Sequence, residues 1–195
     1  MSRISNLLLA AIVALVGVAT ANQTWNVPGD FPLIQTAISS PLVVDGDTIS
    51  VWGPSPWSQT APYYYYENVD FHGKKLVVAS RCFLPGWTGC EPTYDSVIID
   101  GQQLGRVVTM TGSADAVLKG FTIQHGHTSG YGGGVNCNAG SVLKNHIRYN
   151  GAVLGGGGVY YGNWINANCW IEDNVIEHDT APGGGGGILV WDWPT

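Results

Sequence analysis

Charged side chains are scarce in this 195-residue chain, at 11% of all residues, and only 8 of them are Lys or Arg. The basic residues are scattered along the sequence and form no extended positive run. Recognition of nucleic acids and of anionic lipid surfaces depends on clustered positive charge. We therefore expect no nucleic-acid partner and no electrostatic binding to a membrane surface.

Long hydrophobic runs are missing after the first 21 residues. Before that point Arg3 precedes an apolar stretch from Leu7 to Val18, and Ala19-Thr20-Ala21 follows it. A positive start, a short apolar core and a small-x-small end are typical of a cleaved export signal, and a membrane span needs about 20 apolar residues. We predict a signal peptide over 1–21, no membrane span, and a mature protein, 22–195, that is secreted, extracellular or on the cell surface.

Cysteine pairs with the metal-binding spacing Cys-x-x-Cys are also missing, although the chain has 4 cysteines. Cys82 and Cys90 flank Pro85-Gly86, which favours a turn between them, and in an oxidising compartment we predict that they form a disulfide. Cys137 and Cys169 fall on different walls of the repeat described below, so we predict two buried thiols. Neither pair has the additional ligands of a zinc site, and no metal is expected.

Helical periodicity is nearly absent. One segment, from Asp30 to Ser40, carries an apolar helix face with Asp30 suited to the N-cap and Pro32 to the first turn. The residues of that face are Leu33, Ile34, Ala37 and Ile38. We predict a short amphipathic helix that covers the N-terminal end of the fold.

Glycine, by contrast, is abundant, with 28 residues and three conspicuous runs. Each run follows a strand-like segment that ends in isoleucine and precedes a β-branched residue. These two residues are 12 positions apart in all three copies, which are Ile123 with Val135, Ile147 with Val159, and Ile176 with Ile188. A constant spacing of this kind is typical of a solenoid, whose repeats bury their apolar faces by stacking.

Earlier short β-rich segments extend this series, with steps of 27, 21, 24, 24 and 29 residues between successive marks. We predict about six coils. The predicted inward column is Val51, Val78, Ile99, Ile123, Ile147 and Ile176. The chain is therefore expected to be all-β, a parallel β-helix with an N-terminal cap (22–50), first coils with long loops (51–116) and glycine-rich repeats (117–195).

Five segments then arrive in an order found in one known superfamily. They are Trp25 to Ile38, Asp45 to Ile49, Tyr66 to Val69, Gly73 to Leu76 and Ile98 to Gly101. Together they resemble the right-handed parallel β-helix proteins of the pectin lyase-like superfamily, and the Gly-Gly-Gly-Val repeats are similar to secreted bacterial members of unassigned activity and to adhesin-like surface proteins. The resemblance implies a single-stranded right-handed β-helix with a short capping helix. It implies no one activity, because the superfamily holds lyases, hydrolases, esterases and non-enzymes.

An aromatic and proline-rich stretch covers residues 53–66. Its prolines oppose regular strand pairing, so Trp57 and the run from Tyr63 to Tyr66 are expected in or beside a loop. Exposed aromatic rings in a secreted protein stack on sugar rings, and they also pack against the side of a coil. We keep both interpretations and name Trp57 and Tyr64 as glycan-binding candidates.

Alignment of the coils on their isoleucines places equivalent positions above one another. Two residues after the mark stand His125, Tyr149 and His178, and one residue after it stand Asp100, Gln124, Arg148 and Glu177. Because paired strands lie about 4.8 Å apart, the first set is predicted to form a ladder. The ladder is a candidate to bind a glycan, and a mixed polar surface at a strand end is the alternative.

The acidic residues of the last coil are the remaining candidates for chemistry. The resemblance implies that a lyase would hold calcium with acidic residues, and a hydrolase would use paired carboxylates. The candidates are Arg148, Glu172, Asp173 and Glu177. None matches a family motif residue by residue, so we assign no catalytic residue.

Two functions are therefore expected. The favoured one is a secreted or cell-surface module that binds a polysaccharide or cell-surface glycan, or acts as an adhesin-like scaffold, without catalysis or cofactor. The alternative is a polysaccharide lyase or glycoside hydrolase, with calcium if it is a lyase. The sequence reaches Thr195 directly after a strand, without a second capping helix. Since open strand edges recruit further strands, we expect either a continuing chain or self-association at this end.

Overall fold

The computed structural model describes residues 22–52, 62–86, 96–163 and 168–192. Parallel strands dominate these ranges, and the helical elements within them are α1 (Ile34–Ser39) and the 3₁₀ turn η1 (Arg81–Phe83). The prediction of an all-β chain is confirmed. No helix in the described ranges is long and apolar enough to cross a membrane. The predicted signal peptide, Trp57 and Cys90 lie outside the described residues.

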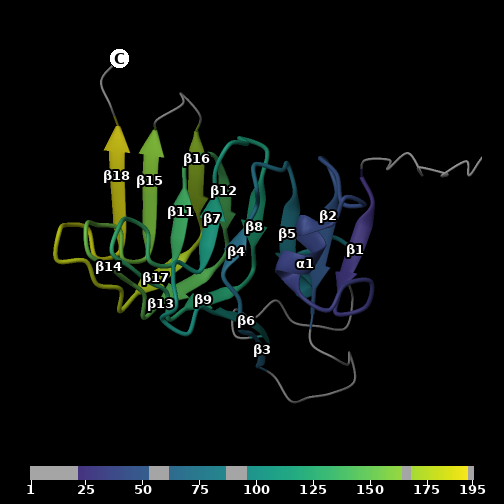
Figure 1. The fold of residues 1–195 in the computed structure, drawn as a ribbon, viewed down its shortest axis with the longest axis horizontal. Helices are drawn as coiled ribbons and strands as arrows, with labels where there is room; N and C mark the ends of the chain where they lie inside the picture. The colour runs from purple at the N-terminus through teal and green to yellow at the C-terminus, as the bar shows by residue number, and fades with distance from the viewer. Residues whose placement is uncertain (1–21, 53–61, 87–95, 164–167, 193–195) are drawn as a thin grey trace, which may run out of the picture.

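Three parallel sheets carry the described part of the chain (Figure 1). Sheet 1 contains, in order, β1 (Thr24–Val27), β2 (Thr48–Val51), β5 (Val77–Ser80), β8 (Val117–Lys119), β12 (Gly140–Leu143) and β16 (Cys169–Glu172). Sheet 2 contains β3 (Tyr63–Tyr65), β6 (Val97–Asp100), β9 (Thr122–Gln124), β13 (His146–Arg148) and β17 (Val175–Glu177). Sheet 3 contains β4 (Val69–Asp70), β7 (Val108–Met110), β11 (Val135–Cys137), β15 (Val159–Asn163) and β18 (Ile188–Asp192). A small pair, β10 (His127–Thr128) and β14 (Gly151–Ala152), lies between the second and third sheets along the chain.

From β2 onward the described strands enter sheet 1, sheet 2 and sheet 3 in that order and then return to sheet 1. We call one such round a coil. Each strand pairs in parallel with the equivalent strand of the neighbouring coil, as Ile123, Ile147 and Ile176 do in sheet 2. This arrangement is compatible with a β-helix.

The predicted inward column is right for its last four members and wrong for its first two. The four that stack in sheet 2 are Ile99, Ile123, Ile147 and Ile176. Val51 and Val78 instead belong to sheet 1, where Val78 pairs with Ile49. Every coil contains several apolar strands, so the spacing between them did not distinguish one wall from another. Tyr65 is the residue that precedes Ile99 in sheet 2.

The expectation that the prolines oppose regular strand pairing was wrong for Tyr63, Tyr64 and Tyr65. They form β3, which pairs with β6, and the Tyr65 side chain belongs to the core with 3% of the residue exposed. Pro62 immediately precedes this strand, where a missing backbone N–H costs no ladder hydrogen bond.

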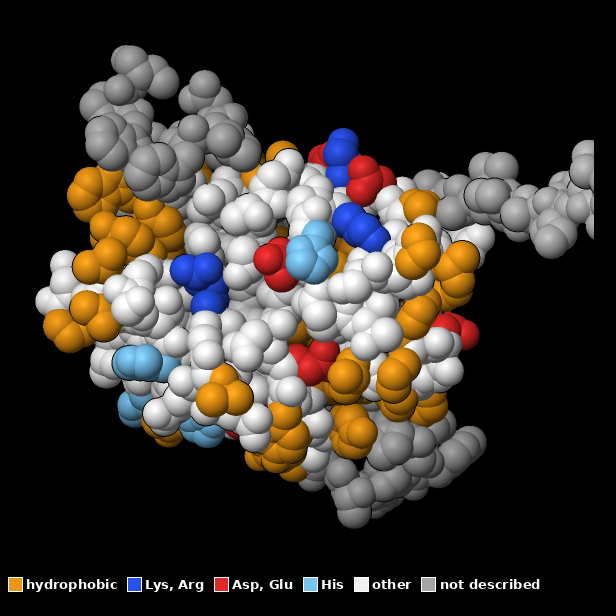
Figure 2. Space-filling view, in the orientation of Figure 1, with side chains coloured by type: hydrophobic (Ala, Val, Ile, Leu, Met, Phe, Trp, Pro, Cys, Tyr) orange, Lys and Arg blue, Asp and Glu red, His pale blue; other side chains and the backbone are white. Residues whose placement is uncertain are grey.

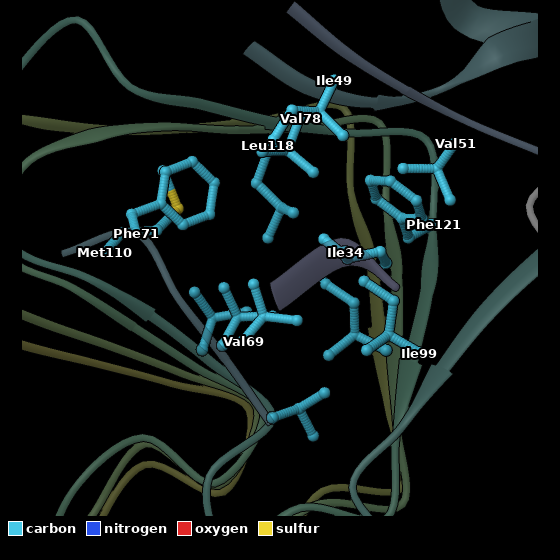
Figure 3. Packing of buried hydrophobic residues seen from close by; sticks show 14 of the residues in the cluster. Ile34, Ile49, Val51, Val69, Phe71, Val78, Ile99, Met110, Leu118 and Phe121 are labelled. Carbon is cyan, nitrogen blue, oxygen red and sulfur yellow. The ribbon is translucent and has the colours of Figure 1, made fainter. Parts of the chain in front are cut away.

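The core is one apolar column enclosed by the three sheets (Figure 3). The helix α1 closes one end of this column. The fully buried members of the column come from every wall. Those labelled in Figure 3 are Ile34, Ile49, Val51, Val69, Phe71, Val78, Ile99, Met110, Leu118 and Phe121. Stacking of β-branched and aromatic residues from coil to coil is what stabilises each coil, since no single coil encloses a core.

The helix α1 contacts β1, β2 and β4 at the end of the stack that holds the N-terminal strands (Figure 1). It begins later than predicted, and its N-cap residue, Leu33, makes no side-chain capping bond. The predicted cap was wrong, because the Asp30 carboxylate accepts the backbone N–H of Asn26 at 2.8 Å. The Glu67 carboxylate caps the helix instead, accepting its first two N–H groups at 3.0 and 2.8 Å.

The prediction that Cys137 and Cys169 are two thiols was also wrong. They form a disulfide with a Cα–Cα distance of 6.1 Å, within the range that a bridge allows. Cys137 ends β11 in sheet 3, and only two residues separate it from β12 in sheet 1. Because Cys169 begins β16, the strand stacked on β12, the two walls meet at this corner. Cys82 is disulfide-bonded, but Cys90 lies outside the described residues, so their predicted pairing stays a prediction.

The glycine runs stack directly on one another. Backbone N–H groups of one run donate to carbonyl groups of the next, for example from Gly134 to Gly157 at 2.9 Å. A Cβ added at Gly133 would lie 2.3 Å from the carbonyl oxygen of Gly151. Only glycine permits this approach, so the runs are explained by backbone packing between coils.

Candidate functional site

The turn after sheet 2 places one side chain per coil on the same outer edge. His125, Tyr149 and His178 each follow the last residue of a strand, and each has a φ of 55°. Few residues other than glycine adopt this left-handed conformation, so its repetition gives the three side chains a common orientation. The ring centroids lie 6.2 Å apart for His125 and Tyr149 and 5.1 Å apart for Tyr149 and His178. These three residues form the expected stack, which we call the aromatic ladder.

A buried asparagine holds the ladder turns together from inside. Asn150 is 2% exposed, and its side-chain oxygen accepts the N–H of Gly126 in the preceding coil at 2.8 Å. Its side-chain nitrogen donates to the carbonyl of Ile123 at 3.1 Å. An amide has both a donor and an acceptor, so a single asparagine satisfies two backbone groups of the preceding coil. The ladder is therefore built on a rigid turn.

Asp179 holds the equivalent position one coil later. Its Oδ1 accepts the backbone N–H of Asn150 at 2.7 Å and the side-chain N–H at 3.0 Å, while its buried Oδ2 has no hydrogen-bond partner among the described residues. Burial raises the pKa of Asp179 to about 7, and the charge of Glu177 adds to the rise, although the bonds from Asn150 oppose it. At mildly acidic pH Asp179 is therefore a neutral carboxylic acid.

A second column of polar side chains lies beside the ladder, one residue earlier in each coil. Gln124 donates from Nε2 to Asp100 Oδ2 at 2.9 Å, and Arg148 donates from Nε to Gln124 Oε1 at 3.3 Å. Glu177 interacts through Oε1 with Nε2 of His146 at 2.8 Å. This hydrogen bond with His146 is the main reason that the pKa of Glu177 is below its ordinary value. Hydrogen bonds thus link Asp100, Gln124 and Arg148 across three successive coils, and Glu177 bonds to His146 of the preceding coil.

Asp100 and His125 join the two columns. The distance from His125 Nδ1 to Asp100 Oδ2 is 2.9 Å, and Asp100 Oδ1 accepts the backbone N–H of Gln102 at 2.9 Å. Burial alone would raise the pKa of Asp100, but the hydrogen bonds from Gln124, Gln102 and His125 lower it below the ordinary value. Asp100 is therefore an ionised acceptor at neutral pH, and His125 donates to it from Nδ1.

Two shallow hollows lie along this edge and share Gln103. The first, of about 320 Å³, is lined by Tyr66, Asp100, Gln102, Gln103 and His125. The second, of about 270 Å³, is lined by Gln103, Gly126, His127, Tyr149, Asn150, Gly151, His178 and Thr180. Histidine side chains gather at the lower left of Figure 2, near the strands labelled β13, β14 and β17 in Figure 1. The ladder and the hollows together form one polar and aromatic surface along the stack.

Not every predicted glycan-binding residue belongs to this surface. Tyr64 is 39% exposed, and its ring stacks on that of Tyr66 with centroids 5.7 Å apart. Tyr66 lines the first hollow but was not singled out from the sequence. Its position directly after Tyr65, like that of Asp100 after Ile99, was the signal that could have found it. Trp57 lies outside the described residues.

The four catalytic candidates lie in two separate places, Arg148 with Glu177 in sheet 2 and Glu172 with Asp173 at the end of β16 in sheet 1. Arg148 and Glu177 are register partners in adjacent strands of sheet 2. Glu172 ends β16 in sheet 1, and Asp173 forms an exposed ion pair with Lys144 at 3.6 Å. Among the described residues no group of three or more His, Cys, Asp or Glu side chains is placed to hold a metal ion.

The fold and the edge define an all-β protein with parallel sheets that presents a row of equivalent turn residues. No protein family model, curated protein or solved structure matches this chain. The resemblance to the pectin lyase-like superfamily therefore stays a prediction.

Proposed function

We propose that the protein is a secreted or cell-surface module with a single-stranded right-handed β-helix fold, which binds a polysaccharide along the aromatic ladder. The observation that carries this proposal is the stack of His125, Tyr149 and His178, whose side chains line two polar hollows along the same edge. Such a surface suits attachment to a cell-surface glycan, as in an adhesin-like scaffold.

The chemistry of the edge suits sugar hydroxyls. Tyr149 and His178 stack with their ring planes 6° apart, which leaves ring edges available for contact with a ligand. Histidine nitrogens, the tyrosine hydroxyl and the amides of Gln102 and Gln103 supply both donors and acceptors, and a sugar hydroxyl needs both. Binding is therefore expected from a row of hydrogen bonds supplemented by contacts between rings and sugar C–H groups.

The geometry of the edge suits a linear ligand. Equivalent turns recur at the spacing of paired strands, about 4.8 Å. The repeated backbone conformation and the buried Asn150 fix the side chains before a ligand arrives. A preformed row reduces the ordering cost of binding, which is the main obstacle for a flat polar surface.

The charges beside the ladder favour neutral polysaccharides over acidic ones. Asp100 and Glu177 both have a lowered pKa and are ionised at neutral pH, and Arg148 is the one cation in their column. Two carboxylates against one guanidinium oppose the approach of a uronate chain. Xylan, mannan and β-glucan are therefore expected to bind more tightly than polygalacturonate or alginate.

Measured binding of these neutral and acidic polysaccharides tests the proposal directly. Tyr149→Ala removes the central ring, and we expect a loss of binding of about 1–2 kcal/mol, roughly tenfold or more in dissociation constant. Affinity electrophoresis screens the panel, and titration calorimetry measures the best ligand. Trp170→Ala is the matched control, because Trp170 is 64% exposed on sheet 1 and outside the ladder. Equal effects of the two substitutions, or no binding at all, would contradict the proposal.

The alternative function is a polysaccharide lyase or glycoside hydrolase, with calcium as the cofactor of a lyase. One observation favours it, namely the placement of Arg148 next to Glu177 across two strands. Its signature is release of unsaturated or reducing sugar ends from an acidic glycan, abolished by Glu177→Ala. That outcome would replace simple binding as the function of this edge.

A further inference from the structure

The Asp100–His125 pair lies where the two hollows adjoin. His125 and Asp100 line the first hollow, and the adjoining Gly126 and Tyr149 line the second. A chain bound along the ladder would therefore cross His125 between the two hollows. The side chain of His125 is 42% exposed and that of Asp100 is 8% exposed, so the imidazole is reachable while its partner is shielded.

The contacts of Asp100 define the state of His125. Asp100 receives hydrogen bonds from Gln124 and from the backbone of Gln102, which hold the carboxylate in place. Because an ionised carboxylate only accepts, the proton of a neutral His125 lies on Nδ1, the atom 2.9 Å from Asp100. The lone pair is then on Nε2. A carboxylate that orients a histidine in this tautomer is the arrangement of a general base.

We propose that Asp100 and His125 form a general-base pair that hydrolyses acyl esters, such as O-acetyl groups, on a glycan bound to the ladder. The glycan as the carrier of the ester rests on the proposed function; the base chemistry does not. His125 is the catalytic residue, and Asp100 is a positioning residue that acts through it.

The reaction needs only water as a co-reactant. His125 Nε2 takes a proton from a water molecule as the water oxygen forms a bond to the acyl carbon, and the carbonyl electron pair moves onto its oxygen. The tetrahedral intermediate then re-forms the carbonyl and expels the sugar oxygen, which receives the proton from Nε2. The products are a carboxylic acid and a free sugar hydroxyl. Side-chain donors of Tyr66, Gln102 and Gln103 line the same hollow and suit the negative oxygen of the intermediate.

Other reactions on a glycan fit these residues less well. Hydrolysis of a glycosidic bond uses two carboxyl groups on opposite sides of the bond. Asp100 is the single carboxylate among the described residues that line the first hollow. Its Oδ2 already accepts hydrogen bonds from His125 and Gln124. Elimination from a uronate requires a positive group to neutralise the sugar carboxylate, and the described residues that line this hollow include no Lys or Arg. Ester hydrolysis needs neither.

The first test uses 4-nitrophenyl acetate, which reports ester hydrolysis without requiring glycan binding. We expect the wild-type chain to hydrolyse it with a rate that His125→Ala lowers at least tenfold, since a positioned general base contributes roughly 10²–10⁴-fold. Asp100→Asn should lower kcat with little change in KM and alter the pH profile. His72→Ala is the control for reaction at an exposed histidine beside a carboxylate, because the His72 side chain is 54% exposed, its Nδ1 lies 3.7 Å from Asp70 Oδ1, and it lines neither hollow. This variant should retain the wild-type rate. Circular dichroism and melting temperatures establish that each variant is folded.

The second test separates this proposal from polysaccharide binding. Acetate release from O-acetylated xylan should be lost in His125→Ala and weakened through KM in Tyr149→Ala. If the protein hydrolyses esters in a His125-dependent way but binds no polysaccharide, the general-base role of Asp100 and His125 stands and a glycan is excluded as the substrate. If the protein binds a glycan but wild type hydrolyses esters no faster than His125→Ala, the general-base proposal is wrong and the proposed binding function stands.

Discussion

At the scale of single residues, Asp179 is a buried group whose protonation is expected to affect stability. Asn150 uses its side-chain nitrogen to donate to a backbone carbonyl, and Asp179 replaces that nitrogen with an oxygen that has no partner in the described structure. Only a protonated Asp179 has a hydrogen to donate from this oxygen. The ladder turn of the last described coil is therefore expected to depend on pH.

The direction of that dependence follows from the pKa. Folding raises the pKa of Asp179 from 3.8 to about 7, so the unfolded chain loses this proton first as the pH rises. The contribution of Asp179 to stability is complete below about pH 4 and declines between pH 4 and pH 7. We expect Asp179→Asn to flatten this decline and to be more stable than wild type at pH 8.

Urea unfolding of both proteins between pH 4 and pH 8 measures this effect. Asp173→Asn is the control, because Asp173 is an exposed partner of Lys144 and should leave the pH slope unchanged. A wild-type slope that persists in Asp179→Asn would assign the pH dependence to other groups.

Single residues were partly predictable from the sequence. Alignment on Ile123, Ile147 and Ile176 predicted the aromatic ladder, since equivalent positions of stacked coils must coincide. The contact between Asp100 and His125 was not predicted, because it crosses from one column to the next and depends on side-chain conformation.

At the scale of elements, the helix α1 is capped by Glu67, a residue distant in sequence that lies between β3 and β4. Glu67 is 9% exposed, and burial raises the pKa of its carboxyl group although two backbone hydrogen bonds oppose the rise. The sequence suggested Asp30 as the cap because capping residues normally stand next to the helix. Glu67 is 33 residues away from Ile34, so local pattern could not reveal it.

Removal of this cap should destabilise the protein. Glu67→Ala leaves the N–H groups of Ile34 and Gln35 without their acceptor in a part of the molecule that is mostly buried. We expect a loss of about 1–3 kcal/mol in the free energy of unfolding. Asp30→Ala, at an exposed site, should cost less than about 1 kcal/mol. Thermal or urea unfolding compares the two, and a larger loss in Asp30→Ala would restore Asp30 as the cap.

At the scale of the whole molecule, spacing predicted that coils stack but not how the walls meet. Val51 and Val78 were placed in the wrong wall because strands of different sheets share the same composition. Cys137 and Cys169 were separated for a related reason. The corner between β11 and β12 is only two residues long and brings sheets 3 and 1 together, which linear spacing does not show.

The last described coil presents strand edges. The strands β16, β17 and β18 each have a neighbour on one side only among the described strands, and apolar residues are exposed near them, including Val190 at 58%. Open edges beside apolar side chains recruit further strands. We expect the 195-residue chain to self-associate, and Val190→Lys to shift it toward the monomer.

Sedimentation velocity over a range of concentrations measures this association. Leu104→Lys is the control, because Leu104 is 80% exposed and lies in the segment between β6 and β7, outside the last described coil. A wild-type chain that stays monomeric at all concentrations, or equal effects of the two lysines, would locate the association elsewhere or exclude it.

The shared φ of 55° at His125, Tyr149 and His178 has a consequence for how recognition can change. Three successive coils each contribute one ladder residue on the same backbone conformation, and the residues that fill the core lie elsewhere in each coil. Substitution at one of these positions changes the ladder there and its ring contact with the adjoining position, while the backbone of the other turns stays the same. For the glycan binding proposed above, specificity should therefore be adjustable at these three positions, and a library of them samples new preferences without redesign of any loop.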